Sequence, residues 1–260
     1  MLHNAIFAGH IDVTEVILST FVLFFIGLVI YLRREDRREG YPLEQDVSGR
    51  LEPSGGLFFT AQPKTYILPH GEGTLTTPNS RRDSQVVKAQ RTSRAPGSPL
   101  EPIGDPMHAG VGPGAFAQRA HKPDLMLNGK PKIVPLRLAD GFFLEADGPD
   151  PRGMKVIGAD NAVGGVVSDV WVDRAEYMIR YLEIEVSGAA AKHVLVPMTM
   201  AVINKSRRTV RIDAVIGSQI SQAPVLANPD QVTMDEEERI CAYYGAGFLY
   251  ATKARSEPFL

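Results

Sequence analysis

An uncharged apolar run near the N-terminus most constrains what this 260-residue chain can fold into. The 17 residues from Val16 to Leu32 carry no charge, and with the residues back to Ile11 the segment reaches 22 residues. At about 1.5 Å per residue, a helix of this length measures roughly 33 Å, enough to cross a hydrocarbon core of about 30 Å. No Lys or Arg precedes the run and no small-residue cleavage site follows it, so a signal peptide fits poorly. We predict a transmembrane helix over residues 11–32.

Charges on the two sides of this segment predict its direction. Residues 1–32 contain no Lys or Arg, whereas four arginines follow within six positions: Arg33, Arg34, Arg37 and Arg38. Because flanks on the cytoplasmic side carry the excess of positive charge, residues 1–10 are expected outside and the remaining 228 residues in the cytoplasm. Tyr31 lies where amphipathic rings favour the headgroups. We expect the arginines to set topology and also to bind anionic membrane lipid.

The rest of the chain has two regions that differ in composition and in hydrophobic pattern. From Glu39 to about Lys130 it is rich in Pro, Gly and Ser, and only TYILP (65–69) and GTLTTP (73–78) suggest short strands. A structureless stretch this long is unusual within a compact domain. Its scattered apolar pieces, such as GLFF (56–59), are typical of a segment laid over the surface of another protein. We therefore predict an extended segment over residues 33–130.

Residues 131–260 are expected to fold as an antiparallel barrel or sandwich, because short strands alternate there with turn residues. Gly164 and Gly165 suit a sharp bend or bulge. The acidic start of MDEEERICAYYGAG (234–247) indicates a helix, with Gly245 as its expected end. The expected strands are KIVPLRL (132–138), GFFLEA (141–146), KVIGAD (155–160), AVGGVVSDVWV (162–172), YMIRYLEIEV (177–186), KHVLVPMTM (192–200) and TVRIDAVI (209–216).

Several motifs of catalysis and binding are missing from the sequence. There is no Gly-rich phosphate loop, no Cys or His metal cluster and no GxSxG elbow, so we expect no enzyme and no bound metal or cofactor. A formal net charge of −2 gives no reason to expect nucleic acid as a partner. The single cysteine, Cys241, forms no intrachain disulfide and is expected to be a small buried side chain.

Charged residues crowd the turn of one expected hairpin, SDVWVDRAEYMIRYLE (168–183). Asp173 alternates with Trp171 on one strand, Glu176 lies in the turn, and Arg180 is expected to share a face with Met178 and Leu182. Burial raises the pKa of carboxyl groups and a nearby arginine lowers it, so two acids and one arginine are able to share a mobile proton. The pattern fits a solvated turn as well as such a buried network.

Six motifs follow one another in order: YLRREDRREGYPLE (31–44), PKTYILPHGEGTLTTP (63–78), GDPMHAGVGPGAF (104–116), PDPRGM (149–154), SDVWVDRAEYMIRYLE (168–183) and ICAYYGAGFLYA (240–251). Together they resemble the H subunit of the purple-bacterial photosynthetic reaction centre over nearly the whole chain. The resemblance implies a single N-terminal transmembrane α-helix after a periplasmic N-terminus. It also implies a segment extended over partner subunits and a mainly-β cytoplasmic domain, a PRC-type β-barrel with a C-terminal helix.

The resemblance implies a role as well. The family's H subunit binds no pigment; it stabilises the L and M core, shields the quinone sites and helps conduct protons from the cytoplasm to the secondary quinone. It implies the bacterial inner (intracytoplasmic) membrane, with bacteriochlorophyll, bacteriopheophytin, quinones and non-haem iron held by partner subunits. L and M are the implied partners, and a cytochrome subunit and light-harvesting antenna are further candidates. The alternative is a membrane-anchored PRC-barrel adaptor protein without photochemistry.

Site residues follow from the same resemblance. Asp173, Glu176 and Arg180 match positions beneath the secondary quinone site, and Glu237, with Glu236 and Glu238 beside it, matches an acidic run near that region. Lys132 and Arg119 fall where basic residues are common, although surface charge explains both. Some members carry a His-x-His pair and an acid that bind metal where protons are taken up; here Asn128, Lys130 and Met126 replace them. The remaining candidates for proton uptake are His70, His121 and Asp124.

Overall fold

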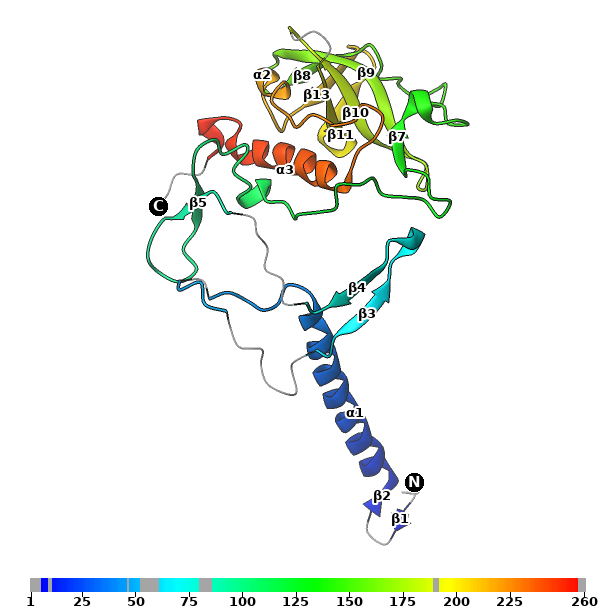
Figure 1. Cartoon of the computed structure of the whole chain (residues 1–260), viewed down its shortest axis with the longest axis vertical. Helices are drawn as coiled ribbons and strands as arrows, with labels where there is room; N and C mark the ends of the chain where they lie inside the picture. The colour runs from blue at the N-terminus through cyan, green and yellow to red at the C-terminus, as the bar shows by residue number, and fades with distance from the viewer. Residues whose placement is uncertain are drawn as a thin grey trace, which may run out of the picture. The chain divides into compact units, whose positions relative to one another are not determined.

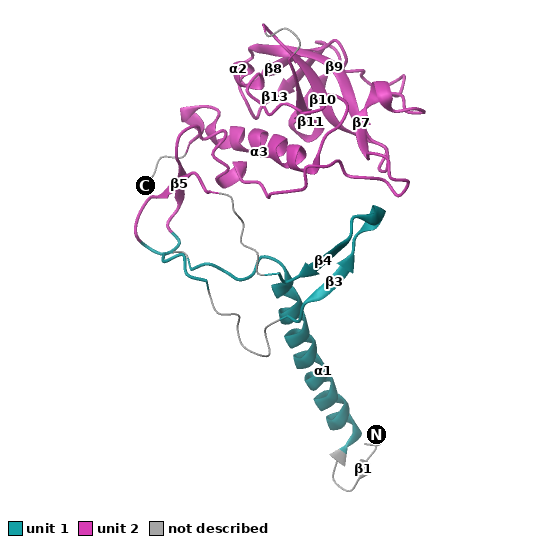
Figure 2. Ribbon diagram, viewed as in Figure 1, with its two compact units in different colours: residues 1–82, 95–97 teal, residues 83–94, 98–260 magenta. Residues whose placement is uncertain are grey.

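The computed structural model describes residues 6–8, 11–45, 47–51, 61–79, 86–188 and 192–256. The chain folds into two compact units, one of Met1–Arg82 with Ala95–Gly97 and one of Asp83–Arg94 with Ser98–Leu260 (Figure 2). The GLFF segment, which the sequence singled out, lies outside the described residues.

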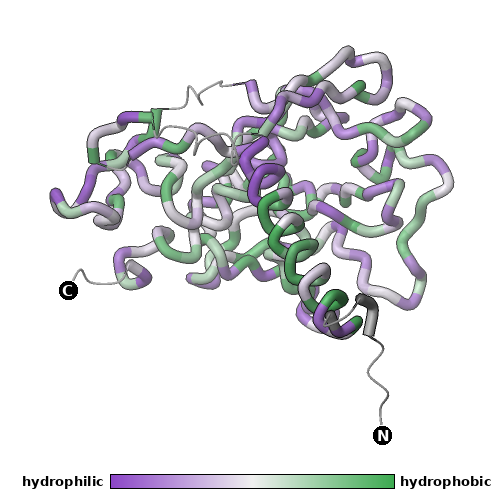
Figure 3. Tube along the Cα trace, turned by 90° about the horizontal axis from the view of Figure 1, so that it is seen from below, coloured by the Kyte–Doolittle hydropathy of each residue, from purple (hydrophilic) through white to green (hydrophobic). Residues whose placement is uncertain are grey.

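The first unit is dominated by the helix α1, Val13–Glu35. It follows a short strand pair, β1 (Ile6–Ala8) and β2 (Ile11–Asp12), and Asp12 caps it by accepting from the backbone N–H of Thr14 at 2.9 Å. None of its residues is buried, and its middle is hydrophobic while its ends are hydrophilic (Figure 3). Within the described part of the chain, the stretch Val13–Arg38 is the one helix long and apolar enough to cross a membrane. The predicted apolar N-terminal helix is therefore present.

A small hairpin joins the end of α1. Its strands are β3 (Lys64–Ile67) and β4 (Thr74–Thr77), connected through the 3-10 turn η2 (Pro69–Gly71) (Figure 1). Both strands match the short strands expected from the sequence. A second 3-10 turn, η1 (Asp36–Arg38), ends α1.

Arg38 and Glu35 tie this hairpin to the helix. Arg38 Nε donates to Glu35 Oε2 at 2.7 Å, and its Nη1 donates to the backbone oxygens of Gln62 and Thr77. Lys64 Nζ reaches the same Glu35 oxygen at 2.8 Å, while Thr77 Oγ1 donates to the carbonyl of Arg38. The Arg38 side chain, 9% exposed, thus serves as a joint between α1 and the hairpin.

The second unit is built on a seven-stranded sheet in the order β11-β10-β9-β8-β13-β12, with β7 paired to β9. All neighbours are antiparallel except β13 and β8. The core gathers around Trp171, Leu182 and Ile212. The strands are β7 (Ile133–Pro135), β8 (Lys155–Gly158), β9 (Val163–Asp173), β10 (Met178–Val186), β11 (His193–Pro197), β12 (Ala201–Asn204) and β13 (Thr209–Ile212).

Two local features of the sheet differ from expectation and one agrees. GFFLEA forms turns and irregular chain, with Phe143 86% exposed, because no strand pairs with it. β12 was not expected; the apolar run before it ends at Pro197 and passes through a 3-10 turn, η5 (Met198–Met200). The bulge expected at the glycines is confirmed, since the β8–β9 register skips Gly164, where Ile220 leaves no room for a side chain.

The helix α3, Met234–Tyr250, begins as the sequence predicts. Thr233 Oγ1 accepts from the backbone N–H of Glu236, and Glu236 Oε2 accepts from that of Thr233, which forms a capping box. The expectation that Gly245 ends the helix is wrong. A Cβ at Gly245 would lie 2.5 Å from the carbonyl oxygen of Pro113, and one at Gly247 would collide with that of Ala214. These glycines allow close approach of backbone.

Residues before the barrel also belong to this unit. The strands β5 (Ala89–Arg91) and β6 (Leu100–Pro102) pair with each other, and the 3-10 turn η3 (Gly112–Gly114) packs on α3. The backbone N–H groups of Met234 and Asp235 donate to the carbonyls of Lys122 and Ala120. The compact unit therefore includes residues that the sequence assigned to the extended segment. Its other short elements are η4 (Leu136–Leu138), α2 (Gly217–Ile220) and η6 (Lys253–Arg255).

Candidate functional site

The turn between β9 and β10 is organised by Asp173, the last residue of β9. Its Oδ1 accepts from the backbone N–H groups of Ala175 at 2.9 Å and Glu176 at 3.0 Å. Its own carbonyl accepts from the backbone N–H of Tyr177, which has a positive φ of 56°. Asp173 is 0% exposed, whereas the Glu176 side chain is 50% exposed. The carboxylate closes the turn locally and leaves Oδ2 for other partners.

Two cations join these two acids. Arg180 Nε donates to Asp173 Oδ2 at 3.1 Å, and its Nη2 donates to Glu176 Oε2 at 3.0 Å. Lys132 Nζ lies 3.2 Å from Glu176 Oε1 and 3.4 Å from Asp173 Oδ2. It also lies 4.0 Å from Asp124 Oδ2. We call Lys132, Asp173, Glu176 and Arg180 the β9–β10 cluster, in which each acid contacts both cations.

The cations fix the charge of Asp173. Burial acts to raise its pKa, but the two backbone N–H donors, Arg180 and Lys132 outweigh burial and hold the pKa below its usual range. The hydrogen bond to Glu176 raises the pKa of Lys132. Asp173 is therefore ionised near neutral pH, and it orients the cations around it.

A bulge places Arg180 in this cluster. The β9–β10 register shifts between Ile179 and Tyr181, so Arg180 has no cross-strand partner. The expected sharing of one face by Arg180, Met178 and Leu182 is therefore wrong. Leu182 is completely buried in the core, whereas Met178 is exposed and the Arg180 side chain is 36% exposed.

A pocket of about 460 Å³ lies beside the cluster. Glu237 of α3 faces it and accepts a hydrogen bond at Oε2 from the hydroxyl of Tyr181 at 2.8 Å. Burial raises the pKa of Glu237 above its ordinary value, although Tyr181 and Arg180 act to lower it. The titratable residues in its lining are Arg119, Asp124, Arg180, Tyr181, Glu237, Glu238 and Cys241.

The structure brings together five of the predicted proton-transfer residues and separates two. Asp173, Glu176, Arg180, Asp124 and Glu237 lie in or beside the β9–β10 cluster and its pocket. His121, whose side chain is 79% exposed, pairs instead with Asp235 at 3.5 Å, and His70 belongs to the other compact unit.

The neighbours of Glu237 in the acidic run have other partners. Glu236 serves the capping box, and Glu238 pairs with Arg119 at 3.5 Å. Tyr181 was missed by sequence reasoning, because its partner comes from a distant helix. Cys241, expected to be buried, is exposed.

The residues predicted for membrane topology take different positions at the end of α1. Tyr31 and Arg33 are exposed, and the guanidinium of Arg37 stacks over the ring of Tyr41 at 5.5 Å. Arg34 belongs to the last turn of the helix, and Arg38 faces the hairpin.

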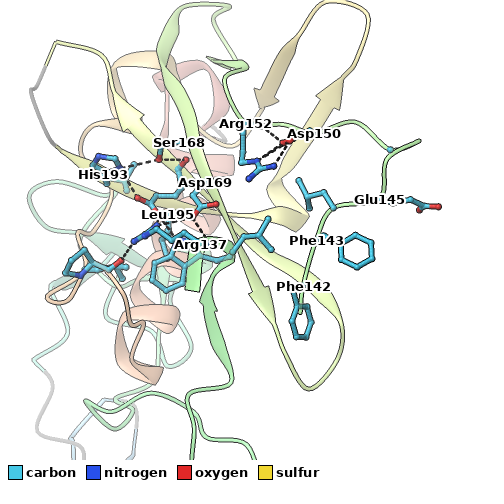
Figure 4. A pocket seen from close by; sticks show the side chains of 18 of the residues that line it. Arg137, Phe142, Phe143, Glu145, Asp150, Arg152, Ser168, Asp169, His193 and Leu195 are labelled. Carbon is cyan, nitrogen blue, oxygen red and sulfur yellow. Dashed lines mark hydrogen bonds and ion pairs between the residues drawn. The ribbon is translucent and has the colours of Figure 1, made fainter. Parts of the chain in front are cut away.

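A second charged cluster, missed from the sequence, lies on another wall of the barrel (Figure 4). Arg137 Nη1 donates to Asp169 Oδ2 at 3.0 Å and to Glu183 Oε2 at 2.9 Å. Glu183 Oε2 also accepts from the indole of Trp171, and Glu183 Oε1 lies 2.9 Å from Nδ1 of His193. We call Arg137, Asp169, Glu183 and His193 the Arg137 cluster. It borders a cavity of about 1130 Å³, the larger of the two described here. The signal in the sequence was an acid within each of two apolar strands, Asp169 and Glu183. In the structure these two acids lie directly opposite each other.

The Arg137 cluster is not arranged for nucleophilic catalysis. Ser168 Oγ lies 3.2 Å from Nδ1 of His193, the same ring nitrogen that meets Glu183. A relay needs the hydroxyl and the carboxylate on different ring nitrogens. Among the residues that the structure describes, no group of three or more His, Cys, Asp or Glu side chains is placed to hold a metal ion.

An apolar helix long enough to cross a membrane, together with a mainly-β unit that carries a cluster of acids and cations, places the chain among mainly-β proteins with one candidate membrane-spanning helix. Residues 5–138, just over half of the chain, match the family model of the photosynthetic reaction centre H-chain N-terminal region, and residues 144–219 match the PRC-barrel domain. The chain belongs to the photosynthetic reaction centre H-chain family. The resemblance and the fold class read from the sequence are both confirmed.

Membership gives the coarse function. The chain is a structural subunit of a photosynthetic reaction centre, associated with the membrane and with the L and M subunits. The family's H subunit is a non-catalytic component of that complex. The N-terminal match also favours the reaction-centre role over a barrel adaptor without photochemistry.

Proposed function

We propose that this subunit stabilises the L and M core, shields the quinone sites from water and conducts protons from the cytoplasm to the secondary quinone. The observation that carries the proton role is the β9–β10 cluster next to its pocket. There, the half-exposed carboxylate of Glu176 accepts a hydrogen bond from Arg180, which also donates to buried Asp173. Proton transfer needs ionisable groups within about 2.6–3.2 Å of each other or one water apart. Arg180 and Lys132 lie 3.0–3.4 Å from both acids and orient the carboxylates for exchange with water, which supports such a path.

Each group has a distinct proposed role. Asp173 stays ionised and holds the two cations in place. Glu176 is the accessible acid of the cluster, and Asp124 and Glu237 line the pocket beside the cluster. His70 and His121 remain candidates for proton uptake at other points of the surface.

The remaining parts of the proposal concern placement. We propose a periplasmic N-terminus (1–10), a transmembrane helix (11–32), a segment covering partner subunits (33–130) and a barrel with a C-terminal helix (131–260). The chain then lies in the bacterial inner membrane, with Arg33, Arg34 and Arg37 near anionic lipid. Bacteriochlorophyll, bacteriopheophytin, quinones and non-haem iron belong to partner subunits, and a cytochrome subunit and antenna are proposed as further partners.

The test is the rate of the second, proton-coupled electron transfer to the quinone in the intact complex. Glu176→Gln removes the accessible acid, and we expect a slowing of about 10-fold or more in flash-induced absorbance kinetics. Glu185→Gln is the matched control, because Glu185 is an exposed acid on the same strand and lies outside the cluster. Unchanged rates over about pH 6–9 in both Glu176→Gln and Asp173→Asn would contradict the proton role.

A further inference from the structure

Tyr181 is a buried side chain whose hydroxyl reaches the pocket. The residue is 4% exposed, and it follows directly after the bulge at Arg180 as the last of four consecutive residues of β10 that line the pocket, 178–181. From the opposite side α3 presents Glu237 and Cys241, which are one helical turn apart and share a face. The Tyr181 hydroxyl donates to Glu237 Oε2 at 2.8 Å and also meets the Cys241 thiol.

Charged groups from each packed element act on Glu237. β10 contributes Arg180, and residues 119–132 contribute Arg119, Asp124 and Lys132; α3 itself contributes Glu238. Burial raises the pKa of Glu237, the Tyr181 hydroxyl and Arg180 lower it, Asp124 raises it and Lys132 lowers it, with a net rise. The carboxyl therefore gains and loses a proton closer to neutral pH than an exposed glutamate does.

Tyr181 itself is fixed as a donor. Burial and the neighbouring carboxylate raise the pKa of the Tyr181 hydroxyl far above its ordinary value, so this group keeps its proton throughout. Oε2 of Glu237 accepts this hydrogen bond, which leaves Oε1 as the oxygen that Tyr181 does not engage and the better acceptor for a proton arriving from the pocket.

We propose that Tyr181 is a positioning residue for proton transfer, which holds Glu237 so that its Oε1 exchanges protons with water in the pocket beside Arg180. A hydronium ion in the pocket gives its excess proton to the carboxylate and becomes water, and the resulting acid gives that proton to another water on the side of the β9–β10 cluster, where a hydronium ion forms. The pocket, about 460 Å³, has room for several waters at about 30 Å³ each. This inference rests on the proposed proton role and adds a residue to it.

The experiment uses the intact complex and compares Tyr181→Phe with Tyr243→Phe. Tyr243 is a matched control, because it is equally buried and its hydroxyl donates to the carbonyl of Gln219 at 2.7 Å instead of to an acid. The infrared band of the protonated Glu237 carboxyl is assigned by its loss in Glu237→Gln. Its titration and the proton uptake rate are then followed over about pH 5–9.

In Tyr181→Phe we expect the Glu237 titration and the pH profile of proton uptake to move upward together by about one pH unit. The sign follows because the lost hydrogen bond stabilised the charged carboxylate. Tyr243→Phe is expected to change neither quantity.

Two results would overturn the inference. An unmoved Glu237 titration in Tyr181→Phe removes the positioning role. A titration that moves while the uptake profile stays in place removes Tyr181 and Glu237 from the proton path. Neither result bears on Glu176→Gln and Asp173→Asn, whose rates test the proposed function itself.

Discussion

The β9–β10 cluster and the Arg137 cluster contain the same kinds of side chain in opposite settings. In the Arg137 cluster, Asp169 and Glu183 are both 7% exposed, and one guanidinium bridges them. In the β9–β10 cluster, one acid is buried and the other is half exposed. Two cations, Lys132 and Arg180, each contact both acids.

The difference is the one expected between a structural role for the Arg137 cluster and the proton role proposed for the β9–β10 cluster. Arg137 links η4, β9, β10 and the loop at Asp230, where its Nη2 donates to Oδ1 at 2.9 Å. Glu183 Oε2 accepts hydrogen bonds from Arg137 and Trp171, and Glu183 Oε1 lies against His193. The β9–β10 cluster keeps Glu176 accessible to solvent. The larger cavity therefore accompanies the cluster that holds strands together, and the smaller one accompanies the cluster proposed to exchange protons.

The largest expected effect is on stability, in Arg137→Met. This change leaves two buried carboxylates opposite each other without the guanidinium that bridges them, at a cost of about 2–3 kcal/mol. The cost stays below that of a fully buried pair, because Arg137 itself is 40% exposed. Thermal denaturation of the solubilised complex checks it, with Arg152→Met as control, since the exposed Arg152–Asp150 pair contributes at most about 0.5 kcal/mol. Equal losses in both variants would contradict the structural role of Arg137.

A smaller, pH-dependent effect is expected in Asp173→Asn. At neutral pH the change removes the charge that Arg180 and Lys132 contact, and should cost about 1–2 kcal/mol. Because the pKa of Asp173 is lowered in the folded chain, its contribution is present above the ordinary pKa of about 3.9. It is lost as the pH falls through the lower, folded value. Denaturation curves of wild type and variant should converge below about pH 4, and a difference that persists there would argue against ionised Asp173.

The smallest stability effect is expected in Glu176→Gln, the same variant that should slow proton transfer. Its side chain is half exposed, so the loss should stay within about 0.5 kcal/mol. Denaturation of the complex used for the flash measurements checks this. A loss above about 1 kcal/mol would make Glu176 a structural residue and weaken the contrast between the clusters.

The sequence predicted the elements whose pattern is local. The uncharged run gave the helix within a few residues of Val13–Glu35, and alternation located β8 to β11. The prediction of a strand over GFFLEA was wrong, because an apolar run becomes a strand only where another strand pairs with it. The prediction that Gly245 ends the helix was wrong, because the role of this glycine depends on Pro113, more than a hundred residues away.

The candidate site was predictable only in part, for the same reason. Asp173, Glu176 and Arg180 lie within one hairpin, so their proximity is local. The Tyr181 to Glu237 bond joins β10 to α3, and the Arg137 cluster joins four separate elements. The spacing of residues along the chain does not predict contacts between elements that are far apart in the sequence.

The glycines of α3 have a consequence for how this helix tolerates change. Gly245 and Gly247 admit the backbone at Pro113 and Ala214, so the rotation of α3 about its own axis is set at its C-terminal half. Glu237 lies two turns earlier on the same rigid rod. If one residue were inserted between them and the two glycines kept their contacts, Glu237 would rotate by about 100° around the helix axis. The number of residues in α3 between these points therefore fixes the direction in which Glu237 faces.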